Sequence, residues 1–158
     1  MSTRSRIGIE LMDGSVKSIY CHWDGYPEGV GKILKEHYTD AEKVKKLVDL
    51  GDISSLGKEY DEEMSKKDWT RFDKNGKLSP EEEKKLQSLT VAYKDRGEDC
   101  PARIDKDVIE FQNKVGNCGE EYTYLFTKGW RDYWHWEVLE TPYFSPLEDF
   151  MERRKGNG

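Results

Sequence analysis

The strict alternation of apolar and polar residues near the N-terminus is the feature that most constrains the fold of this chain, because it places every second side chain on one face of a strand. Residues 5–11 alternate in this way, and residues 16–23 alternate again. Asp13-Gly14 lies between them and favours the positive φ angles of a tight turn. We therefore predict a β-hairpin over residues 5–23. Its apolar face consists of Ile7, Ile9, Leu11, Ile19, Cys21 and Trp23.

A second hairpin is predicted toward the C-terminal end. Residues 121–127 alternate, with Tyr124 and Phe126 on one face, and Lys128-Gly129 supplies a turn. Residues 130–139 are then expected to return as the partner strand. Cross-strand aromatic pairs stabilise such a hairpin by about 0.5–1 kcal/mol each. The residues expected on one side of the return strand are Trp130, Trp134, Trp136 and Val138.

Between the hairpins the period changes to about 3.6 residues, which indicates helices. A helical stripe runs from Val30 to Tyr38, and Thr39 with Glu42 forms a capping box for a second helix that ends near Gly51. The remaining expected elements are a helix after Ser79-Pro80, a short strand at 90–94, a weak helix at 105–115 and one or two helical turns within 142–151.

These elements predict a single α+β domain over residues 1–158, built on a mainly antiparallel sheet of about five strands with three to four helices packed on it. Only 35 % of the residues are hydrophobic, but 12 % are aromatic, so an aromatic-weighted core is expected. Residues 58–89 are rich in Lys and Glu, and we interpret them as a charged insertion that leaves the domain core, called the excursion below. A loosely ordered tail is expected at about 152–158.

The distribution of charge limits the partners that this chain can bind. The net charge is −6, and acidic residues outnumber basic ones within 98–121 and within 137–158. Because there is no basic stripe to neutralise phosphates, direct nucleic-acid binding is not expected. The acidic segments fit either a solvated surface or a face that docks on a basic protein surface.

No stretch of about 18 apolar residues is present, so no membrane span is expected. The N-terminus is not followed by the apolar stretch of a signal peptide, which favours the cytoplasm.

Metal and cofactor motifs are incomplete, so we predict no metal and no cofactor. Three cysteines and three histidines lack the local spacing of a zinc site. Residues 71–82 resemble a calcium loop with Gly76 at the sixth position and Glu82 at the twelfth, but Arg71 stands at the first position, where a carboxylate is required.

The motifs that suggest catalysis are also incomplete, and we assign no catalytic residue. The glycine-rich segment 25–32 follows a strand and precedes a helix, but its glycines match neither a P-loop nor a dinucleotide fingerprint, so it reads as a tight turn. His22 and Asp24 can share a strand face, and Cys118 has no identifiable base nearby. The sequence therefore leaves enzymatic activity open and favours a non-enzymatic role.

Two aromatic segments are the best candidates for a binding surface, because exposed aromatic side chains commonly anchor protein interfaces. The alternative is that these aromatic residues belong to the core of a chain that is poor in aliphatic residues. The predicted partner-binding residues are His22, Trp23, Asp24, Tyr26, Glu28, Trp134, Trp136, Glu98 and Asp99.

Several segments resemble a family of small proteins encoded in phage and prophage genomes. The most specific is 18–31, Ser-Ile-Tyr-Cys-His-Trp-Asp-Gly-Tyr-Pro-Glu-Gly-Val-Gly. The resemblance covers roughly residues 3–57 and 90–130, and the excursion at 58–89 departs from it. The other matching segments are 5–10 (Ser-Arg-Ile-Gly-Ile-Glu), 50–57 (Leu-Gly-Asp-Ile-Ser-Ser-Leu-Gly), 95–98 (Asp-Arg-Gly-Glu) and 121–126 (Glu-Tyr-Thr-Tyr-Leu-Phe).

No functional residue carries over from this resemblance; what it implies is a phage accessory protein made in the cytoplasm of a bacterial host. We therefore expect a stoichiometric binder of a host protein with a basic surface, acting as an inhibitor of antiviral defence in the manner of an anti-CRISPR protein. The alternatives are a binder or hydrolase of a nucleotide second messenger, and a structural or regulatory phage protein.

Overall fold

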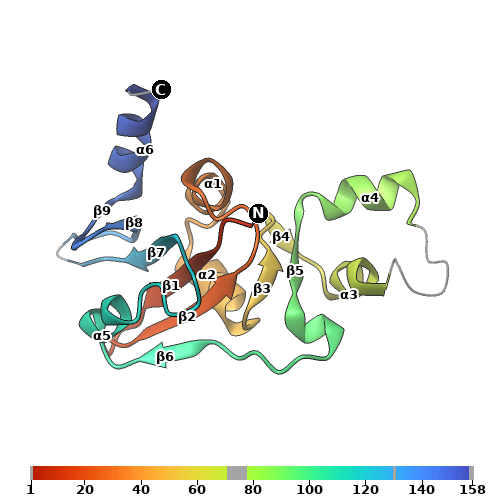
Figure 1. Cartoon of the computed structure of the whole chain (residues 1–158), viewed down its shortest axis with the longest axis horizontal. Coiled ribbons are helices and arrows are strands. Elements are labelled where there is room, and N and C mark those ends of the chain that lie inside the picture. The colour runs from red at the N-terminus through yellow and green to blue at the C-terminus, as the bar shows by residue number, and fades with distance from the viewer. Residues whose placement is uncertain (1, 71–77, 130, 157–158) are drawn as a thin grey trace.

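The computed structural model describes residues 2–70, 78–129 and 131–156. Over these residues the chain forms a sheet of nine strands in the order β4-β5-β3-β2-β1-β7-β8-β9, with β6 paired to β2 beside this path (Figure 1). The strands are β1 (Ser5–Glu10), β2 (Val16–Cys21), β3 (Ile53–Ser55), β4 (Glu59–Tyr60), β5 (Leu89–Ala92), β6 (Arg103–Asp105), β7 (Tyr122–Thr127), β8 (His135–Glu140) and β9 (Tyr143–Pro146).

The predicted N-terminal hairpin is confirmed and forms the centre of the sheet. Strands β1 and β2 are antiparallel with Ile7 opposite Ile19, and both side chains are fully buried. The Asp13 carboxylate accepts a hydrogen bond from the Ser15 amide, and Gly14 has the positive φ angle that the turn requires. Trp23 is an exception to the prediction, because β2 ends two residues before it and its side chain is outside the core.

The predicted α+β class is confirmed. The predicted counts of five strands and three to four helices are too low, because the described residues form nine strands and six α-helices. Strands β3, β4 and β6 have two or three residues each, which is too short for alternation to appear in the sequence. The sheet is also mixed rather than purely antiparallel, because β1 pairs with β7, β2 with β3 and β4 with β5 in parallel.

Helices on one face of the sheet enclose the main core. A π-helical turn (Pro27–Gly31) leads directly into α1 (Lys32–His37), and α2 (Ala41–Asp49) buries Val44 and Val48 against the central strands. The predicted cap of α2 is corrected by one residue: the side chain of Asp40, not Thr39, accepts a hydrogen bond from the Glu42 amide.

The opposite face of the sheet is covered by α5 (Val108–Asn113). Phe111 of this helix is fully buried with Val16 and Leu125. A Cβ atom added at Gly8 would lie 3.1 Å from the Phe111 ring, so the absence of a side chain at this position of β1 leaves room for the ring.

The second hairpin and the tail differ from their predicted bounds. Strand β8 begins at His135 rather than at residue 130, and Trp130 lies outside the described residues. The predicted helical turns become strand β9 and helix α6 (Leu147–Gly156). Residues 152–156, which we expected to be loosely ordered, belong to this helix.

The charged excursion contains two helices, α3 (Glu62–Thr70) and α4 (Pro80–Leu86), which project beyond β5 (Figure 1). The capping box at Ser79 is confirmed, with both reciprocal hydrogen bonds to Glu82 present. Met64, Leu86 and Leu89 form a small separate core. Most of the calcium-like loop, at 71–77, lies outside the described residues.

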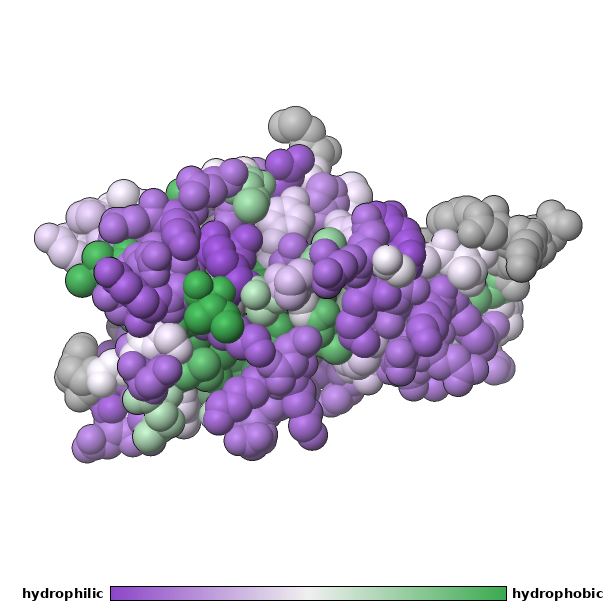
Figure 2. Space-filling view, turned by 90° about the horizontal axis from the view of Figure 1, so that it is seen from below, coloured by the Kyte–Doolittle hydropathy of each residue, from purple (hydrophilic) through white to green (hydrophobic). Residues whose placement is uncertain are grey.

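The surface seen from below is largely hydrophilic, with hydrophobic atoms confined to small patches (Figure 2). Among the described residues, no helix combines the length and the apolar character needed to cross a bilayer.

Candidate functional site

Residues 22–28, which follow β2 and are named the aromatic loop below, are held in place by backbone hydrogen bonds to two different segments. The amides of His22 and Trp23 donate to the carbonyls of Ile53 and Ser54 at 3.2 and 3.0 Å. The Gly25 amide donates to the carbonyl of Thr3 at 2.8 Å. The loop is therefore bonded to the β3 segment on one side and to the N-terminal segment on the other.

Asp24 has an unusual backbone conformation within this loop. Its φ angle of 56° lies in the left-handed region, which costs a non-glycine residue about 1–2 kcal/mol. The Asp24 carbonyl accepts a hydrogen bond from the Val30 amide at 2.9 Å, and a Cβ atom at Gly29 would lie only 2.4 Å from that carbonyl oxygen. Close packing on the π-helical turn thus maintains the strained conformation.

A buried tyrosine supports the aromatic loop from the core. Tyr124 of β7 is fully buried, and its hydroxyl donates a hydrogen bond to the Gly25 carbonyl at 2.7 Å. Burial raises the pKa of Tyr124, so its hydroxyl stays protonated and remains a donor.

The aromatic loop exposes two large side chains on this fixed backbone. Trp23 is 46 % exposed and Tyr26 is 37 % exposed. The His22 ring packs edge-on against the Trp23 ring, with 4.8 Å between ring centroids. Rigid aromatic side chains lose little conformational entropy when they bind, so this arrangement suits an anchor for a partner surface.

The hydrogen bonds of the loop do not form the His22–Asp24 pair that a shared strand face would allow. Instead, Nδ1 of His22 lies 2.8 Å from the hydroxyl of Tyr20. The Asp24 carboxylate accepts from the Tyr26 hydroxyl at 3.4 Å. The imidazole is therefore oriented by a phenol, and the carboxylate-oriented imidazole that the sequence allowed is not formed.

Charge on the loop is partly compensated. Arg154 of α6 holds Glu28 through two hydrogen bonds of 2.6 and 2.8 Å, and these lower the pKa of Glu28. Asp24 forms no ion pair with any residue that the structure describes. The unpaired carboxylate of the loop therefore belongs to Asp24, between the exposed Trp23 and Tyr26 in sequence.

The predicted residues Glu98 and Asp99 lie in the turn that follows the 3-10 helix η2 (Tyr93–Arg96), and both are exposed. Glu98 is paired with Arg96 at 2.6 Å. The structure does not join these two acidic residues to the aromatic loop directly. The connection runs through Tyr93 and the backbone of the β3 segment, residues 52–54.

Sequence reasoning missed this connection. The Tyr93 amide donates to the Asp52 carbonyl at 3.2 Å, and the Ser54 carbonyl accepts from the Trp23 amide at 3.0 Å, so both η2 and the aromatic loop are bonded to the β3 segment. Tyr93 also stacks on Trp69 with 5.4 Å between centroids, and the Arg96 guanidinium lies 4.3 Å from the Trp69 ring centre. No local sequence pattern predicts this stack, because its members come from two separate elements, α3 and η2.

Trp136 is buried rather than on the predicted surface, and Trp134 is only partly exposed. Trp136 is buried, and its indole N–H donates to the Tyr38 carbonyl at 2.8 Å. Trp134 is half-buried and stacks on Phe126 with 5.1 Å between centroids. Both residues lie on the face that the alternation predicts; Trp136 fills the interior beside Tyr38, and Trp134 packs on Phe126 at the edge of the core.

The glycine-rich segment 25–32 does not form an open cradle for phosphate. Two of its amides, those of Gly29 and Val30, donate to the carbonyls of Tyr26 and Asp24. Amides that are already bonded within the loop cannot point at a ligand, whereas a phosphate site needs free amides.

The cysteines and metal-ligating groups do not build a reactive centre either. Cys21 is buried, which raises the pKa of its thiol to about 12. Cys118 is exposed, and its sulfur accepts a hydrogen bond at 3.9 Å from the Arg6 guanidinium, which cannot serve as the base of a thiol nucleophile. Within residues 2–70, 78–129 and 131–156, no three His, Cys, Asp or Glu side chains gather as a metal site would require.

The chain matches no family model, no curated protein and no solved structure. The geometry of the aromatic loop is therefore the basis for the function proposed below.

Proposed function

We propose that this chain is a protein-binding protein that occupies the surface of one partner stoichiometrically through the aromatic loop. The observation that carries the proposal is the exposure of Trp23 and Tyr26 on a backbone that is hydrogen bonded to both neighbouring segments. Binding-hot-spot residues are typically aromatic and preorganised in this way.

The loop also favours a partner with a basic surface. The Asp24 carboxylate lies between two exposed aromatic residues in sequence and is not neutralised by a described cation. A lysine or arginine of a partner can pair with this carboxylate and can also approach the electron-rich face of an aromatic ring. The electrostatic part of the interaction is expected to be modest, because Glu28 is already paired with Arg154.

We further propose that the partner is a bacterial protein and that the chain is a phage accessory protein that inhibits antiviral defence, as an anti-CRISPR protein does. Support comes from the resemblance to phage-encoded proteins, whose most specific segment, 18–31, contains the whole aromatic loop. The alternative of a nucleotide binder has less support, because the amides of Gly29 and Val30 are engaged within the loop.

Comparative affinity capture tests the proposal. The wild-type protein and the double variant Trp23→Ala/Tyr26→Ala are used as bait in bacterial lysate, and captured proteins are quantified by mass spectrometry. We expect one partner to be enriched by the wild type and reduced at least about tenfold with the double variant, because each anchor contributes about 1–2 kcal/mol. Tyr143→Ala is the matched control, since Tyr143 is an aromatic residue of β9 that is 76 % exposed.

A partner retained equally by the wild type and the double variant would exclude the aromatic loop as the binding surface. The electrostatic part is tested on the purified complex by comparing its Kd at about 50 and 300 mM salt. An unchanged Kd contradicts the basic-surface part of the proposal. The inhibitory role requires that phage plaque more efficiently on defence-proficient cells that express the wild-type chain than on cells that express the double variant.

A further inference from the structure

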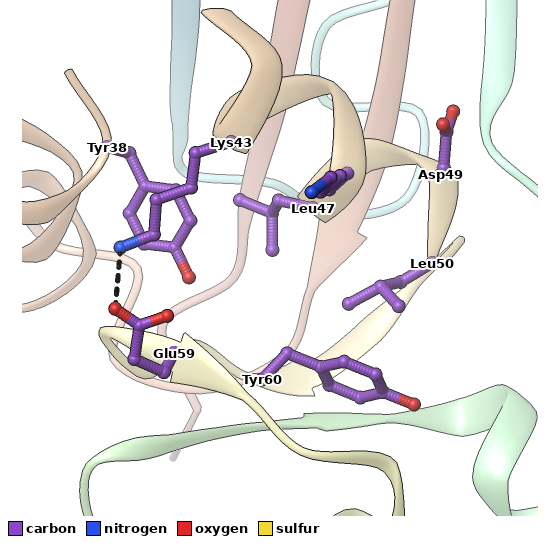
Figure 3. Close-up of a pocket in the computed structure, with 8 residues that line it drawn as sticks. Tyr38, Lys43, Leu47, Asp49, Leu50, Glu59 and Tyr60 are labelled. Atoms are coloured by element: carbon purple, nitrogen blue, oxygen red, sulfur yellow. Dashed lines mark hydrogen bonds and ion pairs between the residues drawn. The ribbon is translucent and has the colours of Figure 1, made fainter. Parts of the chain in front are cut away.

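A second candidate site lies between helix α2 and the edge strand β4, outside the aromatic loop (Figure 3). The cavity there has a volume of about 380 Å³. This is within the range of small-molecule sites, which is roughly 300–1,000 Å³. The cavity is therefore large enough for a compact ring system but too small for a folded partner.

The wall of this cavity is apolar and aromatic. Leu47 of α2 points down between the ring of Tyr38 and the side chain of Leu50, and Tyr60 closes the lower side (Figure 3). The Tyr38 hydroxyl donates to the Gly57 carbonyl at 2.7 Å, and the Tyr60 hydroxyl donates to Asp95 at 2.8 Å. Both hydroxyl protons are engaged elsewhere, so neither tyrosine offers a hydrogen-bond donor to a ligand. Tyr38 is only 2 % exposed, whereas Tyr60 is half-buried, so the ring surface open to a ligand is mainly that of Tyr60.

The rim of the cavity carries one uncompensated positive charge. Glu59 is paired with Lys43 at 3.1 Å, and the Lys43 ammonium lies 4.5 Å from the centre of the Tyr38 ring. Asp49 is paired with Lys17. Lys46 lines the same cavity and forms no ion pair with the described part of the chain.

We propose that this cavity binds a small organic monoanion with a flat aromatic body, whose carboxylate pairs with Lys46. Tyr60 and Leu50 supply most of the apolar surface for the body, with Tyr38 and Leu47 behind them as the buried floor, and the unpaired ammonium matches a single negative charge. A neutral ligand leaves the Lys46 charge unpaired, and a cation is repelled by it. The site is independent of the partner-binding surface proposed above.

Titration with 1-naphthoate tests the proposal on the full-length protein, with binding followed by isothermal calorimetry and by NMR amide shifts. A ligand of this size bound with ordinary efficiency reaches a Kd of about 1 mM. We expect saturable binding near this value, with shifts centred on α2 and β4. We expect the uncharged analogue 1-naphthamide to bind at least about fivefold more weakly, because it lacks the pairing with Lys46.

Two lysine variants of α2 distinguish binding at a specific site from nonspecific binding to the protein surface. Lys46→Glu is expected to weaken 1-naphthoate binding about tenfold, whereas Lys45→Glu leaves it within about twofold, because Lys45 faces Glu42 instead of the cavity. The proposal is overturned if 1-naphthoate does not saturate by about 10 mM, if the amide binds equally well, or if the two lysine variants behave alike.

Discussion

At the scale of single residues, stability depends on an ion pair between Arg6 and Glu120, which is buried on the face of the sheet opposite α2. The Arg6 and Glu120 side chains are 5 % and 0 % exposed, and their closest atoms are 2.7 Å apart. Arg6 also donates to the Ser18 hydroxyl at 3.1 Å, and Glu120 accepts from the Cys118 amide at 2.7 Å. Burial opposes ionisation of Glu120, but these hydrogen bonds outweigh it and lower the pKa of its carboxyl.

Removing one member of this pair is expected to destabilise the protein strongly. Glu120→Gln leaves the Arg6 guanidinium buried without its counter-charge, and we expect a loss of about 3 kcal/mol in the free energy of unfolding. Urea denaturation measures this loss. Glu121→Gln, at the exposed neighbouring position, is the control and is expected to change stability by less than about 0.5 kcal/mol.

The lowered pKa of Glu120 predicts that the free energy of unfolding decreases as the pH falls. Because the pKa of Glu120 is lower in the folded than in the unfolded state, its contribution is present above the unfolded pKa and is lost as the pH falls through the folded value. Unfolding free energy should therefore fall more steeply below about pH 4.5 in the wild type than in Glu120→Gln. Parallel pH profiles for the two proteins would contradict this assignment.

At the scale of elements, the turn from β2 into the π-helical segment determines the shape of the aromatic loop. Gly25 approaches the backbone of Thr3 so closely that an added Cβ atom would lie 2.8 Å from its carbonyl oxygen. Gly29 approaches the Asp24 carbonyl still more closely. These glycines are required for close approach of two backbones, and a larger residue at either position must displace the loop.

Gly29→Ala is expected to destabilise the protein by about 2 kcal/mol or more and to weaken binding through the aromatic loop, because the new methyl group collides with the Asp24 carbonyl. Urea denaturation and capture of the partner measure the two effects. Gly97→Ala is the contrast: it adds strain at a positive φ angle but has open space around it, so it should cost about 1 kcal/mol and leave capture unchanged. Equal losses of stability and capture in the two variants would refute the steric explanation.

At the scale of the whole molecule, helix α3 of the α3–α4 excursion is attached to β5 through Trp69 and through Ser65, whose hydroxyl accepts from the Ala92 amide at 3.0 Å. The indole N–H of Trp69 donates to the Ala92 carbonyl at 2.8 Å, and its ring stacks on Tyr93 and contacts the Arg96 guanidinium. The excursion has its own small core around Met64. A unit with few contacts to the main core can open locally without global unfolding.

Trp69→Ala is therefore expected to release the excursion while leaving the central hairpin intact. Hydrogen exchange should accelerate at least about tenfold in α3 and α4, with little change at the amides of β1 and β2. Trp69→Phe keeps an aromatic stack but loses the hydrogen bond, so an intermediate effect is expected. A uniform acceleration across the whole chain would show that the excursion and the sheet unfold together.

The sequence by itself determined the elements whose signals are local. The alternation of residues 5–23 with Asp13-Gly14 specifies the central hairpin, and the Ser79–Glu82 capping box specifies the start of α4, because each depends on neighbours within a few residues. The aromatic residues of the candidate loop were also visible in the sequence.

Only the tertiary structure decided which of these aromatic residues are exposed and which elements meet. Trp23 and Trp136 have the same side chain and both lie on an alternating pattern, but one lies beyond the end of β2 in solvent and the other bonds to the Tyr38 carbonyl in the core. The parallel pairing of β1 with β7 joins segments more than a hundred residues apart. Burial and strand pairing depend on such distant neighbours, and periodicity carries no information about them.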